Sequence, residues 1–325
     1  MKLLIITDAW QPQVNGVVRT YNNILRYIPD AKVIHPYMPD FRRRPLIGYR
    51  EIEVVINPWR VKRHVWLAMH EGYHVHVATE GPLGLFAKLE LDRYGYSYTT
   101  SLHTLFPEFI ETSMRIPAWI TYPYFRWFHK KARRTMVPSQ GIKTHMEGKG
   151  FKHIRIWTRG VDPDVFNPSS RTEQKSPYIL SVSRISKEKG LDDFCRLAYP
   201  RKVVIGDGPY LAELMRKYPD VEFLGKKEGP GLAYWYANAE AFVFASKADT
   251  FGIVLLEAIA CGTPVAAYPE PGPLEVLDDA NGAVNQDLHQ ALQSALTRDR
   301  AAVHASSRLW TWARSAEHFI KILGE

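Results

Sequence analysis

Residues 241–265 constrain the fold of this chain more than any other stretch. Residues 241–245 form an uninterrupted apolar run, which is typical of a strand buried on both faces. A polar turn and a helical segment follow, and Gly262 and Pro264 end that segment before another apolar run begins at Val265. A strand, a tight turn and a helix N-terminus together present backbone N–H groups and the helix dipole to a phosphate.

Two carboxylates accompany this turn, Asp249 at its mouth and Glu257 in the helical segment. Because like charges repel, these carboxylates suit the neutral hydroxyl groups of a sugar and a ribose, and not the phosphate itself. In an ordinary strand–helix unit, Asp249 would cap the helix and Glu257 would face solvent.

Residues 249–265 as a whole resemble the signature of the retaining glycosyltransferases of family 4, which have the GT-B fold. That signature has two acidic residues with seven residues between them around a Phe-Gly pair, then Leu-Glu-Ala and Gly-x-Pro-Val, and all of these parts occur here. Asp249 departs from the pattern, because Glu is commoner there, and its shorter side chain requires a bound sugar hydroxyl to lie closer. The resemblance implies an α/β protein with two facing, doubly wound Rossmann-like domains, a nucleotide sugar in their cleft, and a C-terminal helix that crosses back to the first domain.

The length and composition agree with two globular domains. A chain of 325 residues suffices for two domains of about 150 residues each. The two cysteines, Cys195 and Cys261, give neither a metal-ligand spacing nor a disulfide framework, which favours a reducing compartment. Residues 1–6 are too short for a signal peptide, and no run approaches the roughly 20 apolar residues of a membrane span. We therefore expect a cytoplasmic protein.

Charge is divided unevenly along the chain. Residues 1–160 hold 24 Lys and Arg against 12 Asp and Glu, a net charge of +12, whereas residues 161–325 hold 18 against 22, a net charge of −4. The excess of cations predicts an anionic partner for the first half, which is a phospholipid surface, an acidic glycan or a nucleic acid. A basic surface that only solubilises the protein is the alternative.

Short apolar runs alternate with helical stretches through the first half, which predicts a doubly wound parallel sheet. The expected strands are residues 2–8, 31–34, 53–56, 75–79, 97–101 and, as the last strand of the first domain, 135–139.

Two loops of this half carry candidate donor ligands. Asn15 and Gly16 precede a helix expected at residues 17–27, and the matching family loop approaches the donor diphosphate, so Asn15, Gly16 and Val17 are candidate donor-binding residues. His103 follows a strand at the edge where ligands of such sheets gather. A lone His is more often structural, but residues 103–108 resemble the family segment whose His lies near the donor sugar and its phosphate.

Aromatic and cationic side chains are mixed between residues 108 and 135. This mixture fits a helix in the headgroup layer of a membrane. It would equally stack bases and bind phosphates of a nucleic acid, or pack with its aromatic side chains inward and its cations outward. The candidate residues for acceptor or membrane contact are Arg126, Trp127, Lys130, Lys131, Arg133 and Arg134.

Residues 154–168 resemble the family's crossover between domains, and the polar residues 169–176 that follow have no apolar period. Asp162 and Asp164 form an Asp-x-Asp pattern within the crossover, but the resemblance leads us to expect no metal there. The expected domains are residues 1–168 for the acceptor and residues 169–306 for the nucleotide sugar, with residues 307–325 as the returning helix.

The second half supplies further candidate donor ligands. Arg184 and Lys189 lie five apart on a loop after a strand, where two cations can converge on one diphosphate, although a solvated basic loop has the same spacing. The family's Arg…Lys-Gly motif implies that both stabilise the leaving diphosphate, while Asp249 and His103 serve the sugar and Glu257 the ribose. The remaining candidate donor-binding residues are Gly206, Gly208, Gly225, Lys226, Thr250, Phe251, Gly252, Ile253 and Val254.

The resemblance implies a retaining hexosyltransferase that uses a UDP- or GDP-linked sugar without a metal or cofactor. Residues 15–20, 103–108 and 159–162 most resemble the mannosyl- and glycolipid-forming branch, so the expected acceptor is a diacylglycerol or lipid-linked glycan at the cytoplasmic membrane face. A soluble glycan, a small metabolite and modified DNA stay open as acceptors. Two other classes are a non-catalytic nucleic-acid or membrane binding protein on this scaffold and a sugar-nucleotide epimerase. A binding module would need none of the acids and cations of the donor motifs.

Overall fold

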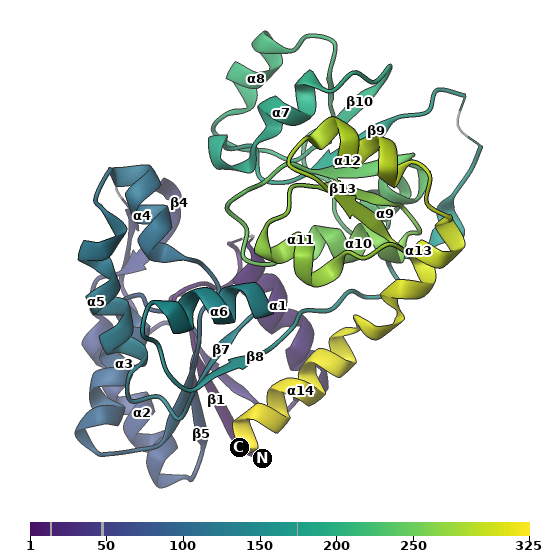
Figure 1. Ribbon diagram of the computed structural model, residues 1–325. Coiled ribbons are helices and arrows are strands. Elements are labelled where there is room, and N and C mark those ends of the chain that lie inside the picture. The colour runs from purple at the N-terminus through teal and green to yellow at the C-terminus, as the bar shows by residue number, and fades with distance from the viewer. Residues whose placement is uncertain (14, 47–48, 174) are drawn as a thin grey trace. The chain divides into compact units, whose positions relative to one another are not determined.

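The computed structural model describes residues 1–13, 15–46, 49–173 and 175–325 (Figure 1). The chain divides into two compact units. Unit 1 contains Met1–Thr158 and Ser315–Glu325, and unit 2 contains Arg159–Arg314. These boundaries, at 158/159 and 314/315, differ in position from the domain boundaries expected from the sequence.

Unit 1 is built on a parallel sheet, as expected. Its strands lie in the order β2-β1-β5-β6-β7-β8. Continuous apolar runs such as Leu3–Ile6 form these strands because helices cover both faces of the sheet. The strands are β1 (Leu3–Ile6), β2 (Lys32–Ile34), β5 (His74–Val77), β6 (Tyr98–Ser101), β7 (Arg134–Val137) and β8 (Ile154–Ile156).

Two expectations for unit 1 are wrong. Residues 53–56 do not join the parallel sheet; they overlap β4 (Tyr49–Val55), which pairs with β3 (Arg43–Leu46) in a separate antiparallel hairpin. Glu53 and Val54 are only half-buried, as suits a hairpin and not a strand covered on both faces. The strand at 135–139 is also not the last one, because β8 pairs with β7 beyond it.

Two sets of helices cover the sheet of unit 1. Side chains of α2, α3 and α5 pack with Leu4, Ile6 and Val75 on one face. On the other face, the rings of Tyr21 and Phe319 lie 6.5 Å apart, which brings α1 and α14 together. The helices are α1 (Gly16–Ile24), α2 (Val61–His70), α3 (Pro82–Arg93), α4 (Phe106–Met114), α5 (Ala118–His129), α6 (Gln140–Gly148) and, from Ser315 on, α14 (Trp312–Gly324).

Unit 2 has its own parallel sheet, in the order β11-β10-β9-β12-β13-β14. The strands are β9 (Ile179–Val182), β10 (Lys202–Ile205), β11 (Glu222–Phe223), β12 (Ala241–Phe244), β13 (Val265–Ala267) and β14 (Gly282–Val284). The helices are α7 (Leu191–Arg196), α8 (Leu211–Lys217), α9 (Gly229–Asn238), α10 (Ile253–Ala260), α11 (Pro271–Val276), α12 (Leu288–Ala295) and α13 (Arg300–Ser306).

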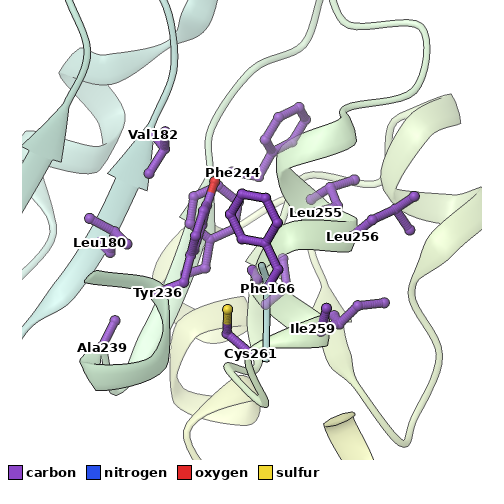
Figure 2. Packing of buried hydrophobic residues seen from close by; sticks show 14 of the residues in the cluster. Phe166, Leu180, Val182, Tyr236, Ala239, Phe244, Leu255, Leu256, Ile259 and Cys261 are labelled. Carbon is purple, nitrogen blue, oxygen red and sulfur yellow. The ribbon is translucent and has the colours of Figure 1, made fainter. Parts of the chain in front are cut away.

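Helix α10 is the centre of a large apolar cluster in unit 2 (Figure 2). Its sequence is apolar on every side except at Glu257, which is the pattern of a fully buried helix. Leu255, Leu256 and Ile259 pack in the same cluster as Tyr236 of α9 and Phe244 of β12. The burial of this helix fixes where its N-terminus lies.

Each sheet has one reversal point, which is the pair of neighbouring strands from which the chain order runs outward in opposite directions. In unit 2 this point lies between β9 and β12, and in unit 1 it lies between β1 and β5. The loops that follow two such strands diverge to opposite faces, and ligands of open α/β sheets bind in the space that this divergence leaves.

Candidate functional site

Most candidate donor groups of unit 2 lie on the loops that follow β9, β10 and β12. Two glycines hold the first two loops together. A Cβ atom on Gly206 would lie 1.9 Å from the carbonyl oxygen of Ser183, and one on Gly208 would lie 2.3 Å from that of Ile185. The Ile185 amide also donates to the carbonyl oxygen of Asp207 over 2.9 Å. Backbone contacts therefore set the position of the loop that carries Arg184, whose side chain is exposed.

The same device attaches the Lys189 loop to the end of β12. Gly190 has a left-handed φ of 64°, and a Cβ there would lie 2.3 Å from the carbonyl oxygen of Ala245. Lys189 thereby reaches Asp249, with 2.6 Å between the ammonium nitrogen Nζ and the carboxylate oxygen Oδ1. The structure thus brings together two residues predicted for the donor site, across the point where the strand order reverses.

The N-terminus of α10 lies on the same loop as Asp249. Gly252 caps the helix at a φ of 85°, and Gly272 of α11 lies so close to Phe251 that a Cβ would be 2.3 Å from the Phe251 carbonyl oxygen. Phe251 is buried against Trp310, with 5.9 Å between the ring centroids. Thr250, Phe251, Gly252, Ile253 and Val254 therefore form the turn and helix start that the sequence predicts.

Glu257 is buried and does not face solvent. The Tyr236 hydroxyl donates to its Oε2 over 3.1 Å, which joins α9 to α10. A buried carboxylate needs such a partner, because its desolvation is costly. Burial, with the Glu257 charge adding to it, raises the pKa of Cys261, so that this thiol stays protonated.

Gly225 and Lys226 lie on the loop after β11. The Gly206 amide donates to the Gly225 carbonyl oxygen over 3.0 Å, so Gly225 adjoins the glycine-rich loop. The Lys226 ammonium lies 2.8 Å from Glu228, and both side chains are about half exposed. Lys226 is therefore a solvated residue next to its own counter-ion.

Asn15, Gly16 and Val17 form the start of α1 in unit 1, as expected. The side-chain oxygen of Asn15 accepts hydrogen bonds from the amides of Val17 and Val18, each over 3.0 Å. This N-cap satisfies two of the first amides of α1, including that of Val17, within the protein itself.

His103 lies at the carboxyl end of β6, next to a buried polar network that the sequence did not reveal. The Tyr21 hydroxyl lies 3.2 Å from His103 Nε2, 2.9 Å from His76 Nε2 and 2.7 Å from Ser101 Oγ. His76 Nδ1 in turn lies 2.8 Å from Thr99 Oγ1. Because a hydroxyl donates only one hydrogen bond, Tyr21 couples the orientation of His103 to the network behind it.

Burial keeps the histidines of β5 neutral. Complete burial lowers the pKa of His76 to about 3, and the charge of His74 adds to the effect. Burial, with Arg133 nearby, lowers the pKa of His74 to about 4. Strand β5 of unit 1 therefore carries two imidazoles that stay uncharged at neutral pH, of which His76 is fully buried.

The reversal point of unit 1 is filled by a carboxylate of the protein itself. Asp8 follows β1 and accepts hydrogen bonds from the amides of Leu83 and Gly84 at the start of α3, over 2.7 and 3.2 Å. Thr79 donates a third hydrogen bond over 2.8 Å. Burial raises the pKa of Asp8 to about 6, against the effect of these hydrogen bonds.

The aromatic residues of α5 are divided between two faces. Tyr122, Phe125 and Phe128 are buried, whereas Trp119 is 75% exposed and Trp127 is 43% exposed. Among the candidate cations, Arg126, Lys130 and Lys131 are exposed as well. The outward face therefore combines aromatic and cationic side chains, while inward packing accounts for the other aromatic residues.

Arg133 and Arg134 contact the end of α14 within unit 1. Arg133 donates to the Gly324 carbonyl oxygen over 3.2 Å, and the Arg134 guanidinium lies 3.6 Å from the Glu325 carboxylate. These two candidates for acceptor contact thus have intramolecular partners.

Within the described ranges, no group of three or more His, Cys, Asp and Glu side chains is arranged to hold a metal ion. Asp162 accepts a hydrogen bond from the Asp164 amide over 3.2 Å, which is a local turn contact. No described helix combines the length and the apolar character needed to cross a membrane.

Family models and known relatives agree on the class of protein. A model described as Glycosyl transferases group 1 matches residues 164–303, and one described as Glycosyltransferase Family 4 matches residues 14–165. A GDP-mannose-dependent alpha-mannosyltransferase of Mycobacterium tuberculosis is 30% identical over 308 residues, which cover 85% of this chain and 81% of that protein. This chain belongs to glycosyltransferase family 4.

A second relative of this glycosyltransferase is the alpha-monoglucosyldiacylglycerol synthase of Streptococcus pneumoniae. The two proteins are 34% identical over 381 residues, and the alignment covers 100% of this chain and 85% of the relative. The fold of the glycosyltransferase matches that of Anabaena HepE, solved in complex with UDP, with a TM-score of 0.74, 17% identity and full coverage of both chains. The GT-B fold expected from the sequence is therefore confirmed.

Proposed function

We propose that this glycosyltransferase moves a hexose from a UDP- or GDP-linked donor to a lipid hydroxyl at the cytoplasmic membrane face, with retention of the anomeric configuration and without a metal. The observation that carries the proposal is the arrangement at the reversal point of unit 2. There, Lys189, Asp249 and the N-terminus of α10 come together on loops held by glycine contacts.

Charge stabilisation is the chemistry that this arrangement supports. When the glycosidic bond to the donor breaks, negative charge develops on the departing diphosphate. Arg184, Lys189 and the helix N-terminus would stabilise that charge in fixed positions, which is the role that a metal ion fills in other transferases. Asp249 would bind sugar hydroxyls and Glu257 the ribose, while His103 and the Asn15–Val17 loop stay predicted donor contacts of unit 1.

The proposed lipid acceptor rests on the outward face of α4 and α5 and on the relatives. Met114, Trp119 and Ile120 are at least half exposed. Exposed apolar side chains beside Arg126, Lys130 and Lys131 suit an anionic lipid surface. One relative is an alpha-monoglucosyldiacylglycerol synthase, and another is a GDP-mannose-dependent alpha-mannosyltransferase.

The test is transfer by purified protein with a panel of UDP- and GDP-sugars, with and without anionic liposomes that contain diacylglycerol, in the presence of a chelator. We expect one donor to be consumed, a rate that rises on liposomes, and an α-linked product by NMR. Lys189→Ala and Glu257→Ala should each abolish transfer in a folded protein. A transfer rate equal to that of the wild type in either variant would contradict the proposed site.

Membrane contact is tested separately by a matched pair of surface variants. Trp119→Ser should lose most of the stimulation by liposomes, because it removes the most exposed aromatic side chain of α5. Met215→Ser removes a side chain of unit 2 that is 47% exposed, and it should leave the stimulation unchanged. An equal response of both variants would favour a soluble acceptor.

A further inference from the structure

The ion pair between Lys189 and Asp249 joins two groups that are predicted to bind different parts of the donor. Their charged atoms are 2.6 Å apart, and the side chains are only 20% and 26% exposed. Among the residues that the structure describes, each charged group is the only hydrogen-bond or ion-pair partner of the other. A half-buried pair of this kind is screened by water less than a surface pair.

The backbone fixes the lysine side of the pair. The Lys189 amide donates to the Ser186 carbonyl oxygen over 3.1 Å, and Gly190 packs on the carbonyl of Ala245 at the end of β12. Asp249 follows β12 on the loop that leads to α10. The pair is therefore a consequence of the loop positions and not of two long side chains that meet on an open surface.

We propose, on the basis of the function proposed above, that Asp249 competes with the donor diphosphate for Lys189, so that the enzyme prefers an intact nucleotide sugar to the nucleoside diphosphate that it releases. A diphosphate that binds Lys189 weakens the ion pair between Lys189 and Asp249. The half-buried carboxylate then lies beside an anion and has lost its partner, which is costly.

A nucleotide sugar removes this cost, whereas a nucleoside diphosphate does not. The sugar hydroxyl groups donate hydrogen bonds to Asp249 in place of the lysine, while the diphosphate takes the lysine. After transfer the sugar has left, and Asp249 again draws Lys189 away from the diphosphate. The ion pair thereby favours product release as well as donor selection.

The test is calorimetric titration of the wild type, Asp249→Asn, Lys189→Met and the double variant with UDP, with GDP and with the corresponding nucleotide sugars. We expect Asp249→Asn to bind the nucleoside diphosphate about 10-fold more tightly than the wild type, because the competitor for Lys189 is gone. Its affinity for the nucleotide sugar should rise less, or fall, because the sugar hydroxyls lose their acceptor. In the Lys189→Met background the gain should disappear.

Asp279→Asn is the control, because it removes the same charge from an exposed position of unit 2. Tighter binding by this variant would show a general charge effect and overturn the proposal. Unchanged or weaker diphosphate binding by Asp249→Asn would also overturn it, as would a gain that persists without Lys189, which would mean simple repulsion by Asp249. If the wild type binds neither diphosphates nor nucleotide sugars, the proposed function itself fails, and the competition fails with it.

Discussion

The two units follow the same plan of parallel strands and covering helices, but they fill their reversal points differently. In unit 1, the first amides of α3 donate to Asp8, so a carboxylate of the protein occupies the place of an anion. In unit 2, the N-cap of α10 is Gly252, which has no side chain to accept hydrogen bonds from the helix amides, and the nearby Asp249 pairs with Lys189. A helix N-terminus at a reversal point is therefore not by itself a ligand site, because a side chain of the protein can accept the hydrogen bonds of its amides.

Glycine serves a different purpose in each unit. Gly81 gives Asp8 room at α3, since a Cβ there would lie 2.5 Å from the Asp8 carboxyl carbon. In unit 2, Gly190, Gly206 and Gly208 instead bring one loop against the backbone of another. The arrangement in unit 1 lets a side chain of the protein occupy the helix N-terminus. The arrangement in unit 2 brings several loops close to one another.

The largest expected difference between the units concerns catalysis. Lys189→Met should lower transfer at least about 100-fold, because it removes a fixed positive charge from the departing diphosphate. Asp8→Ala should change transfer less than about 2-fold if Asp8 only completes α3. Steady-state rates at saturating donor measure both. A severe loss of kcat in folded Asp8→Ala would show that unit 1 also uses its reversal point in the reaction.

The next largest effect concerns stability. Asp8→Ala should destabilise unit 1 by about 1–3 kcal/mol, because two helix amides and a threonine hydroxyl lose their acceptor. Hydrogen exchange of the α3 amides measures this change. Since the folded protein raises the pKa of Asp8 from 3.8 to about 6, its contribution is largest in acid and falls as the pH rises through 6.

The loss in Asp8→Ala should therefore be larger at pH 5 than at pH 7. Asp30→Ala is a control, because it removes an exposed aspartate of unit 1. A loss that is independent of pH in Asp8→Ala would contradict the raised pKa.

A further pH effect follows from His76, which is buried in β5 of unit 1. An unfolded His binds a proton below pH 6.5, whereas folded His76 does so only near pH 3. The unfolded state therefore gains protons first, and unit 1 loses stability as the pH falls from 6.5, by up to about 1.4 kcal/mol per pH unit for this residue.

His76→Gln should flatten this loss while His289→Gln, on α12 of unit 2, should not. Hydrogen exchange of β5 and β6 between pH 6.5 and 4.5 measures the slope. The same slope in both variants would exclude His76 as its origin.

The sequence predicted the parallel sheets and the helix after β12, because continuous apolar runs and Gly-Pro punctuation are local signals. It did not predict the hairpin of β3 and β4, since an apolar run such as residues 53–56 suits an edge hairpin as well as a buried strand. Tyr21 was missed because its partners His76 and Ser101 lie 55 and 80 residues away. The partner of Asp8 at α3 was missed for the same reason.

The candidate site was predicted as a set of residues but not as a set of contacts. Motif resemblance placed Lys189 and Asp249 in one site without showing that they pair. It also left the orientation of Glu257 open, and the structure shows that packing of α10 buries it against Tyr236. Such contacts depend on how distant segments pack, which local patterns do not encode.

The backbone contacts of Gly190, Gly206 and Gly208 bear on how such an enzyme changes over evolutionary time. The loops after β9, β10 and β12 are held to one another by main-chain contacts at these glycines, and the Arg184 side chain is exposed. A substitution at an exposed position such as Arg184 can alter what the loops recognise while the contacts at the glycines stay in place. A scaffold of this kind can acquire a new sugar preference through single residue changes, while the glycines are the positions that tolerate no exchange.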